Sequence, residues 1–243
     1  MKRICQFSVI ILVSLFAFSC RTTSILKTNF NTMSIGATPA HDLPGDPSGD
    51  RVDFNEALAP GLKIREWNST GTKGLEYSYV NTGSLSGHRT WLSFRGISTN
   101  FAQTIWYIYS AKYSTVYGGD ILTDLTDGAG TPIARMRITA SGSVSLISGD
   151  WITARVIGNI PPGAVHSVIF TVNVSQSKYN LMITSPGREA IRVTDEPMMA
   201  TNPLDFHNPA NPAISFQLGE GGGQDSKYTI ESISITRNDP SKK

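Results

Sequence analysis

The chain has 243 residues, which is enough for one large β domain or two small ones. Only 16% of the residues are charged and the formal net charge is +2, so the composition excludes the strong field of a nucleic-acid-binding protein or of a trap for acidic ligands. The 2 cysteines, Cys5 and Cys20, both lie near the start of the chain. We therefore expect no nucleic-acid partner and no disulfide within the domain.

The beginning of the chain has the features of an export signal. Two basic residues precede the apolar run 7–18, which is shorter than a membrane span. The run ends at Ser19 and Cys20, which resembles the lipobox of bacterial lipoproteins, where a small residue precedes the cysteine that is lipidated. The resemblance implies a signal peptide over 1–19, a lipid on Cys20, and a place in the bacterial cell envelope, anchored to the outer membrane on its periplasmic side or at the cell surface. Secretion with cleavage nearby is the alternative.

Residues 20–50 show no sustained hydrophobic period. Prolines and glycines cluster between positions 39 and 49, and aromatic residues are few. This composition is typical of a flexible segment, so we predict a tether that lets an anchored domain stand on the order of tens of Å from a membrane. The domain itself is predicted over 51–237, and a disordered tail over 238–243.

Short runs of alternating apolar and polar residues, separated by turn residues, fill the chain from residue 51 onward. Strands are predicted over 51–57, 62–67, 75–79, 89–95, 103–113, 133–140, 144–147, 151–157, 189–194, 214–218 and 228–236, with two more in the hairpin 164–187. The interval 118–130 is predicted as a loop, and a spacing of three between Ile230 and Ile233 predicts a β-bulge. No helix longer than about one turn is expected.

The hairpin 164–187 gives the clearest pattern. Val168 and Phe170 lie on one face of its first strand and Thr171 on the other, while 175–177 supply a polar turn. A hairpin with one apolar face needs a second sheet to cover that face. We therefore predict an all-β fold, a two-sheet antiparallel β-sandwich (jelly roll) of about a dozen strands.

The strands of the C-terminal half carry a family resemblance. Segments 165–172 (VHSVIFTV), 179–183 (YNLMI), 214–219 (ISFQLG) and 228–235 (YTIESISI) follow one another in an order that resembles the concanavalin A-like lectin/glucanase superfamily, in its laminin-G-like bacterial branch. The resemblance covers about residues 130–237. It implies a jelly roll whose concave face often binds glycans, and therefore a carbohydrate partner.

Aromatic and basic residues in two predicted strands form the candidate ligand site, which consists of Trp91, Arg95, Trp106, Tyr107 and Tyr109. Flat rings stack on the apolar faces of sugars, and neighbouring polar groups bond their hydroxyls. Packing in the core is the alternative for each ring. Trp91 and Trp106 are preferred, because apolar neighbours in the same strands already supply an inward face.

Catalytic motifs are sparse. Carboxylates are present, but no Glu-x-Asp-x-x-Glu motif of the superfamily's hydrolases occurs, and the sequence signatures of jelly-roll alginate lyases are absent. His166 falls in register with Val168 and Phe170, which indicates a buried histidine and not a catalytic one. The leading hypothesis is a lipid-anchored envelope protein that binds polysaccharide without cleaving it. A polysaccharide lyase or glycoside hydrolase is the second hypothesis, and a structural or adhesive domain with a protein partner is the third.

No cofactor is expected, although three carboxylates in the predicted loop 118–130 offer oxygen ligands of the kind that calcium favours. They are Asp120, Asp124 and Asp127, and their spacing is not that of an EF-hand. A solvated acidic turn is the alternative. No cluster of histidine and cysteine indicates zinc.

Overall fold

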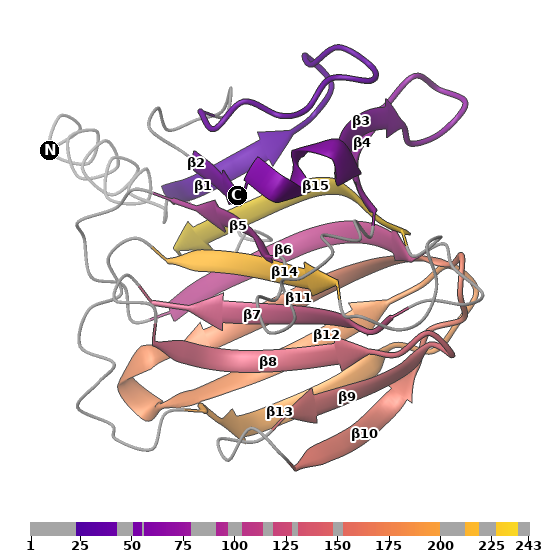
Figure 1. Cartoon of the computed structure of the whole chain (residues 1–243). Helices are drawn as coiled ribbons and strands as arrows, with labels where there is room; N and C mark the ends of the chain where they lie inside the picture. Colours follow the sequence, from indigo (N-terminus) through magenta and orange to yellow (C-terminus); the bar gives the residue numbers. More distant parts are fainter. Residues whose placement is uncertain are drawn as a thin grey trace, which may run out of the picture.

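A computed structural model describes residues 23–42, 51–54, 56–78, 91–96, 104–113, 119–127, 131–147, 153–199, 212–218 and 227–237. The strands form two antiparallel sheets that pack face to face, and Figure 1 looks onto the seven-stranded sheet with the eight-stranded sheet behind it. The predicted all-β, two-sheet sandwich is confirmed. Within the described residues no helix is long and apolar enough to cross a membrane. The predicted signal peptide, Cys20 and the tail 238–243 lie outside this part of the chain.

The eight-stranded sheet has the order β13-β12-β11-β6-β15-β4-β3, and β1 also pairs with β15. Its strands are β1 (Thr23–Asn29), β3 (Leu62–Glu66), β4 (Lys73–Ser78), β6 (Thr104–Tyr113), β11 (Val165–Asn173), β12 (Lys178–Thr184), β13 (Ile191–Pro197) and β15 (Lys227–Arg237). Two short 3₁₀ helices accompany it, η1 (Glu56–Gly61) and η2 (Val174–Gln176).

The seven-stranded sheet has the order β10-β9-β8-β7-β14-β5-β2. Its strands are β2 (Arg51–Phe54), β5 (Trp91–Arg95), β7 (Ile121–Thr126), β8 (Pro132–Ile138), β9 (Ser143–Ile147), β10 (Ala154–Asn159) and β14 (Ala213–Leu218). Every pairing in both sheets is antiparallel.

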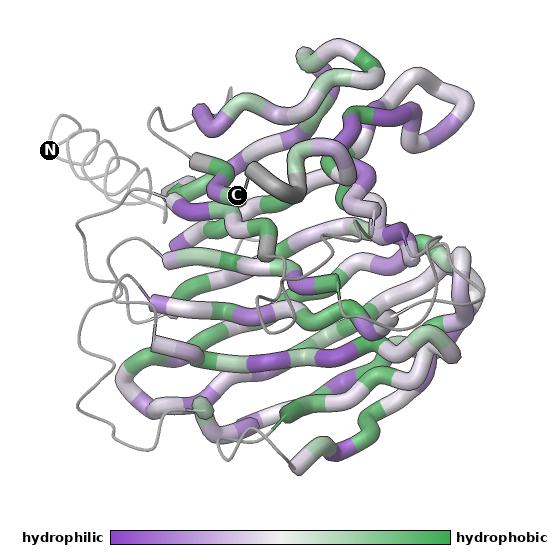
Figure 2. Tube along the Cα trace, viewed as in Figure 1, coloured by the Kyte–Doolittle hydropathy of each residue, from purple (hydrophilic) through white to green (hydrophobic). Residues whose placement is uncertain are grey.

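The core lies between the two sheets. In most strands alternate residues are apolar and point inward, which Figure 2 shows as a repeating change of hydropathy along the strands. The rings of Tyr109 and Phe216 meet edge to face with centroids 5.2 Å apart. The Tyr109 hydroxyl reaches the Thr123 hydroxyl of the opposite sheet at 3.1 Å, so a polar contact also crosses the core. Burial raises the pKa of Tyr109 to about 12, which keeps the phenol neutral.

The hairpin and the bulge form as predicted. β11 and β12 pair in register, and Asn173 caps the η2 turn by accepting a hydrogen bond from the Gln176 backbone. Phe170 is fully buried while Thr171 lies on the outer face. The register of β15 shifts between Ile230 and Ser232, where the bulge was predicted.

Residues 23–42 are not a tether, contrary to the prediction for 20–50. β1 pairs with the second half of β15, and Ile25, Leu26 and Phe30 are buried in the core. A register shift between Ser24 and Leu26 places two successive apolar residues inside. This bulge removes the alternation that marks a strand in the sequence, which explains why the strand was not predicted.

The prediction of a loop over 118–130 was also wrong, because this interval contains the strand β7. Its residues Ile121 to Leu125 are all buried, so the strand shows no alternation of exposed and covered positions. Its aspartates, threonines and flanking glycines are the residues that favour turns. β7 lies near the middle of the seven-stranded sheet, between β8 and β14.

Candidate functional site

A row of polar residues crosses the outer face of the seven-stranded sheet. Arg135, Asp124, Ser215, Ser93 and Asp53 are successive cross-strand partners on β8, β7, β14, β5 and β2. The residues on either side of them point into the core, so these five lie on the face turned away from it. We call this set the polar row.

Asp124 accepts the hydrogen bonds that organise one end of the polar row. Its Oδ1 accepts a hydrogen bond from Arg135 Nε at 2.5 Å, and its Oδ2 accepts one from Arg135 Nη2 at 2.6 Å and one from Gln217 Nε2 at 2.8 Å. The residue is only 5% exposed although it points away from the core. A buried carboxylate is tolerated when such bidentate, charge-assisted bonds satisfy it. The network therefore fixes the orientation of one guanidinium and one amide on this face.

Gln217, which donates to Asp124, also has a side-chain oxygen that accepts no hydrogen bond from the described residues. Its Oε1 is buried and has no hydrogen-bond donor in the described chain. A buried acceptor without a donor costs free energy, and a ligand hydroxyl or an ordered water is the usual way to satisfy it. We therefore take this network as the candidate site.

The other end of the polar row makes weaker contacts. The Ser215 hydroxyl donates to the Ser93 hydroxyl at 3.0 Å. At the end of the row Asp53 forms an ion pair with Arg95 at 3.5 Å, and the Arg95 side chain is about half exposed. Such an exposed pair contributes little to stability.

Trp91 and Arg95 both belong to β5 and therefore to the sheet that carries the polar row. Trp91 pairs with Gln217, and Arg95 pairs with Ala213. The side chain of Trp91 lies outside the described part, whereas Arg95 is exposed on the outer face.

The other three predicted ligand residues lie elsewhere. Tyr107 and Tyr109 are fully buried between the sheets, so as ligand contacts they were wrong, and the core alternative holds for both. Trp106 lies half-buried on the outer face of the eight-stranded sheet. The prediction treated the strands around Trp91 and Trp106 as neighbours, but β5 and β6 belong to different sheets. The five residues consequently do not form one surface.

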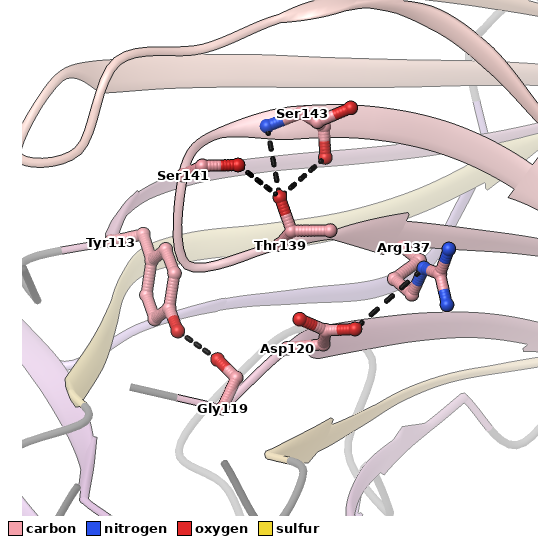
Figure 3. A network of polar contacts seen from close by, with 7 residues as sticks. All are labelled: Tyr113, Gly119, Asp120, Arg137, Thr139, Ser141 and Ser143. Atoms are coloured by element: carbon pink, nitrogen blue, oxygen red, sulfur yellow. Dashed lines mark hydrogen bonds and ion pairs between the residues drawn. The ribbon is translucent and has the colours of Figure 1, made fainter. Parts of the chain in front are cut away.

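The three predicted calcium ligands are not gathered around a common point. Asp124 is engaged by Arg135, and Asp120 forms an ion pair with Arg137 at 3.7 Å, as Figure 3 shows. Asp127 accepts a hydrogen bond from the Thr131 backbone. Because Asp120 and Asp124 are four residues apart along extended chain, about 13 Å separates their Cα atoms. No group of three or more His, Cys, Asp or Glu side chains suited to a metal occurs in the described ranges.

His166 is a buried structural residue, as predicted. Its Nε2 lies 3.0 Å from the Tyr228 hydroxyl and its Nδ1 lies 3.2 Å from the Ala164 carbonyl oxygen. The carbonyl can only accept, so Nδ1 carries the proton and Nε2 accepts from the tyrosine. Burial lowers the pKa of His166 to about 4, which keeps the ring neutral at neutral pH.

No known protein family and no curated protein sequence matches the chain. Solved structures do match. The catalytic domain of a glycoside hydrolase family 131 protein from Coprinopsis cinerea has a TM-score of 0.60 at 10% identity, covering 90% of this chain and 95% of that one. Lectin I from Ulex europaeus, solved with the methyl glycoside of α-L-fucose, has a TM-score of 0.52 at 13% identity, covering 87% and 97%.

A chain described as a sialidase matches with a TM-score of 0.52 at 11% identity over 91% of this chain, but this chain spans only 19% of the sialidase. At these identities the matches concern the fold alone. The chain thus has the β-sandwich fold of these lectins and of this hydrolase domain.

Proposed function

We propose that the protein binds carbohydrate on the outer face of the seven-stranded sheet and does not cleave it. The network of Asp124, Arg135 and Gln217 carries the proposal. It presents fixed donors and an unused acceptor, which are the groups that recognise sugar hydroxyls. The lectin-like fold supports the same ligand class. A laminin-G-like relationship within this fold remains part of the proposal.

The spacing of carboxylates supports binding without hydrolysis. Asp53 and Asp124 lie in the same row but three strand spacings apart, which is about 14 Å between Cα atoms. Glycoside hydrolases place their two carboxyl groups about 5 to 9.5 Å apart. Asp120 and Asp124 are too distant for the same reason. No other pair in the polar row is available, because its remaining members are arginine and serine.

The alternative of an enzyme rests on two observations. One similar structure is a glycoside hydrolase catalytic domain. Arg135 and Gln217 are also the residue types that a polysaccharide lyase uses to bind a substrate carboxylate. A lyase further needs a tyrosine or histidine base, and His166 is buried in the core.

We also propose that Cys20 carries a lipid and that the protein belongs to the bacterial cell envelope. The Ser19-Cys20 pair after a short apolar run supports this. The carbohydrate ligand would then be a polysaccharide of the envelope or its surroundings.

A glycan array with the full-length protein tests the proposal. Gln217→Ala should abolish or strongly weaken binding, since it removes the unused acceptor and one donor to Asp124. Arg65→Gln is the matched control, because this exposed residue of β3 lies on the other sheet and forms an ion pair with Glu76 at the surface. Assays for new reducing ends and for unsaturated products should stay negative. Product release would establish the enzyme instead, and an array without any bound glycan would favour a protein partner.

A further inference from the structure

A small hollow opens on the outer face of the eight-stranded sheet, near the turn of the β11–β12 hairpin. Its volume is about 140 Å³, comparable to the roughly 150 Å³ of a cavity that accepts a benzene ring. Four strands supply its polar lining, chiefly Thr104, Thr171, Asn173, Lys178, Asn180 and Asp195. It lies on the other sheet from the polar row.

A β-bulge shapes one wall of the hollow. Tyr179 pairs with Glu196 and Leu181 pairs with Val193, so Asn180 lies opposite two residues of β13 instead of one. One of the two is Asp195, whose φ of 54° lies in the left-handed region. Asn180 Oδ1 accepts a hydrogen bond from the Asp195 backbone at 2.8 Å. Strained conformations of this kind concentrate at functional sites, and here the strain keeps a carboxylate at the hollow.

Trp106 lies directly beside the hollow. It follows Thr104 by two residues on the same face of β6, and its cross-strand partner is Thr171. Both threonines line the hollow. Trp106 alternates with the buried Ile105 and Tyr107, so its ring belongs to the outer face, where it is partly exposed. A flat indole beside a polar hollow is the pairing that stacks one sugar ring and bonds the hydroxyls of the next.

The charges of the lining indicate an uncharged ligand. Lys178 and Asp195 are the two charged residues among those that line the hollow, and their charges cancel. Neither forms an ion pair within the described residues, so both are available to a ligand. A phosphate or a metal ion would need charges of one sign, whereas a mixture of donors and acceptors matches a neutral sugar.

From this geometry we infer that Trp106 and the hollow form a second saccharide-binding site, which takes two adjacent units of an uncharged oligosaccharide, one on the indole and the next in the hollow. The site is independent of the polar row, because the two lie on opposite outer faces of the sandwich.

Calorimetric titration of the full-length protein with neutral oligosaccharides of glucose, mannose and galactose tests this inference. Two variants remove the site: Trp106→Ala, and Asp195→Asn, which suits the left-handed conformation and deletes only the charge. Each should weaken binding of one of these oligosaccharides about tenfold, the effect of losing a stacking contact or a charged hydrogen bond. Arg65→Gln, on β3 at the opposite edge of the same sheet, should leave that binding unchanged.

Equal affinity in wild type, Trp106→Ala and Asp195→Asn would overturn the second site, as would a wild type that binds none of the neutral probes. Urea midpoints of both variants keep a folding defect apart from a binding defect. If Gln217→Ala alone loses binding, the polar row is the binding site and the second site is overturned. If only Trp106→Ala and Asp195→Asn lose binding, the second site is supported and these sugars do not bind at the polar row.

Discussion

His166 shows how burial changes the chemistry of a single side chain. The ring exchanges hydrogen bonds with Tyr228 and Ala164, and its pKa of about 4 lies below the ordinary value of 6.5. Between these two values the unfolded chain binds a proton that the folded chain does not. The free energy of unfolding must therefore fall as the pH falls from 6.5 towards 4.

Urea denaturation of wild type at pH 7 and pH 5 should show a loss of about 2 kcal/mol from this residue alone. His166→Gln lacks the titrating group, so its stability should change less over the same interval. The quantity to compare is the difference in pH dependence between the two proteins. Identical pH profiles would mean that His166 is not the group responsible.

The sequence largely predicted which single side chains point into the core and which point away from it. Alternation placed Phe170 inward and Thr171 outward, and it separated Ile105 from Trp106 correctly. The role of Asp124 was not predictable in this way. Its partner Arg135 lies on another strand, and only the register of β7 with β8 brings the two together.

Among the larger elements, the turn between β8 and β9 depends on one glycine. Figure 3 shows the Thr139 hydroxyl bonding to Ser141 and Ser143 in this turn. Gly142 has a φ of +85°, and a Cβ placed there would lie 1.9 Å from the backbone oxygen of Ile160. Since the Ile160 backbone also donates to the Gly142 carbonyl, the turn and the β10–β11 connection are held against each other.

Gly142→Ala should therefore lower the free energy of unfolding by more than about 2 kcal/mol, because strain and a backbone clash add together. Gly163→Ala is a matched control: its φ is +79°, yet nothing lies within 4 Å of the added Cβ. The control should cost only about 1 kcal/mol. Thermal or urea unfolding measures both, and equal losses would show that the contact with Ile160 is unimportant.

A second test concerns whether β1 packs as a core strand. Leu26 is fully buried and Lys27 next to it is exposed. Leu26→Ala should cost about 2 to 5 kcal/mol, as large-to-small core changes do, while Lys27→Ala should cost little. A tether would give no loss for either substitution, so urea midpoints of the two variants distinguish the alternatives.

The sequence predicted the strands in which apolar and polar residues alternate. It did not predict the strands in which a bulge or complete burial removes that alternation. The hairpin of β11 and β12 and the bulge in β15 belong to the first group, and β1 and β7 to the second. Sheet membership is a different matter. β5 and β6 follow one another in the chain but pair with β14 and β11, which come more than 50 residues later. Such long-range pairing is invisible to a local period, and this is why one predicted site was divided between two faces.

The two sheets of the sandwich contact each other along one edge. β10 and β13 are the outermost strands of their sheets, and Arg155 of one pairs with Glu196 of the other at 2.5 Å. Gly158 lets Ile191 approach closely, because a Cβ there would lie 2.5 Å from the end of that side chain. The sandwich is therefore closed on this side by an ion pair and an apolar contact.

Replacing Cys20 by alanine should move the protein from the membrane fraction to the soluble fraction. A diacylated and N-acylated cysteine supplies the two-chain anchoring that makes attachment stable, and alanine cannot accept it. Fractionation of cells followed by immunoblotting measures the change. An unchanged distribution would contradict the lipid anchor.

The position of β1 sets how far a lipid on Cys20 would let the protein reach. Two residues lie between Cys20 and Thr23, and the three Cα–Cα steps from one to the other span at most about 10 Å. Register places Thr23 beside Arg237, Arg237 beside Ile105, and the neighbouring Thr104 beside Asn173, all at one end of the eight-stranded sheet. The hollow next to Trp106 opens at this same end. An anchored copy would thus hold the hollow close to the lipid surface, so a sugar on a glycolipid head group would lie within its reach.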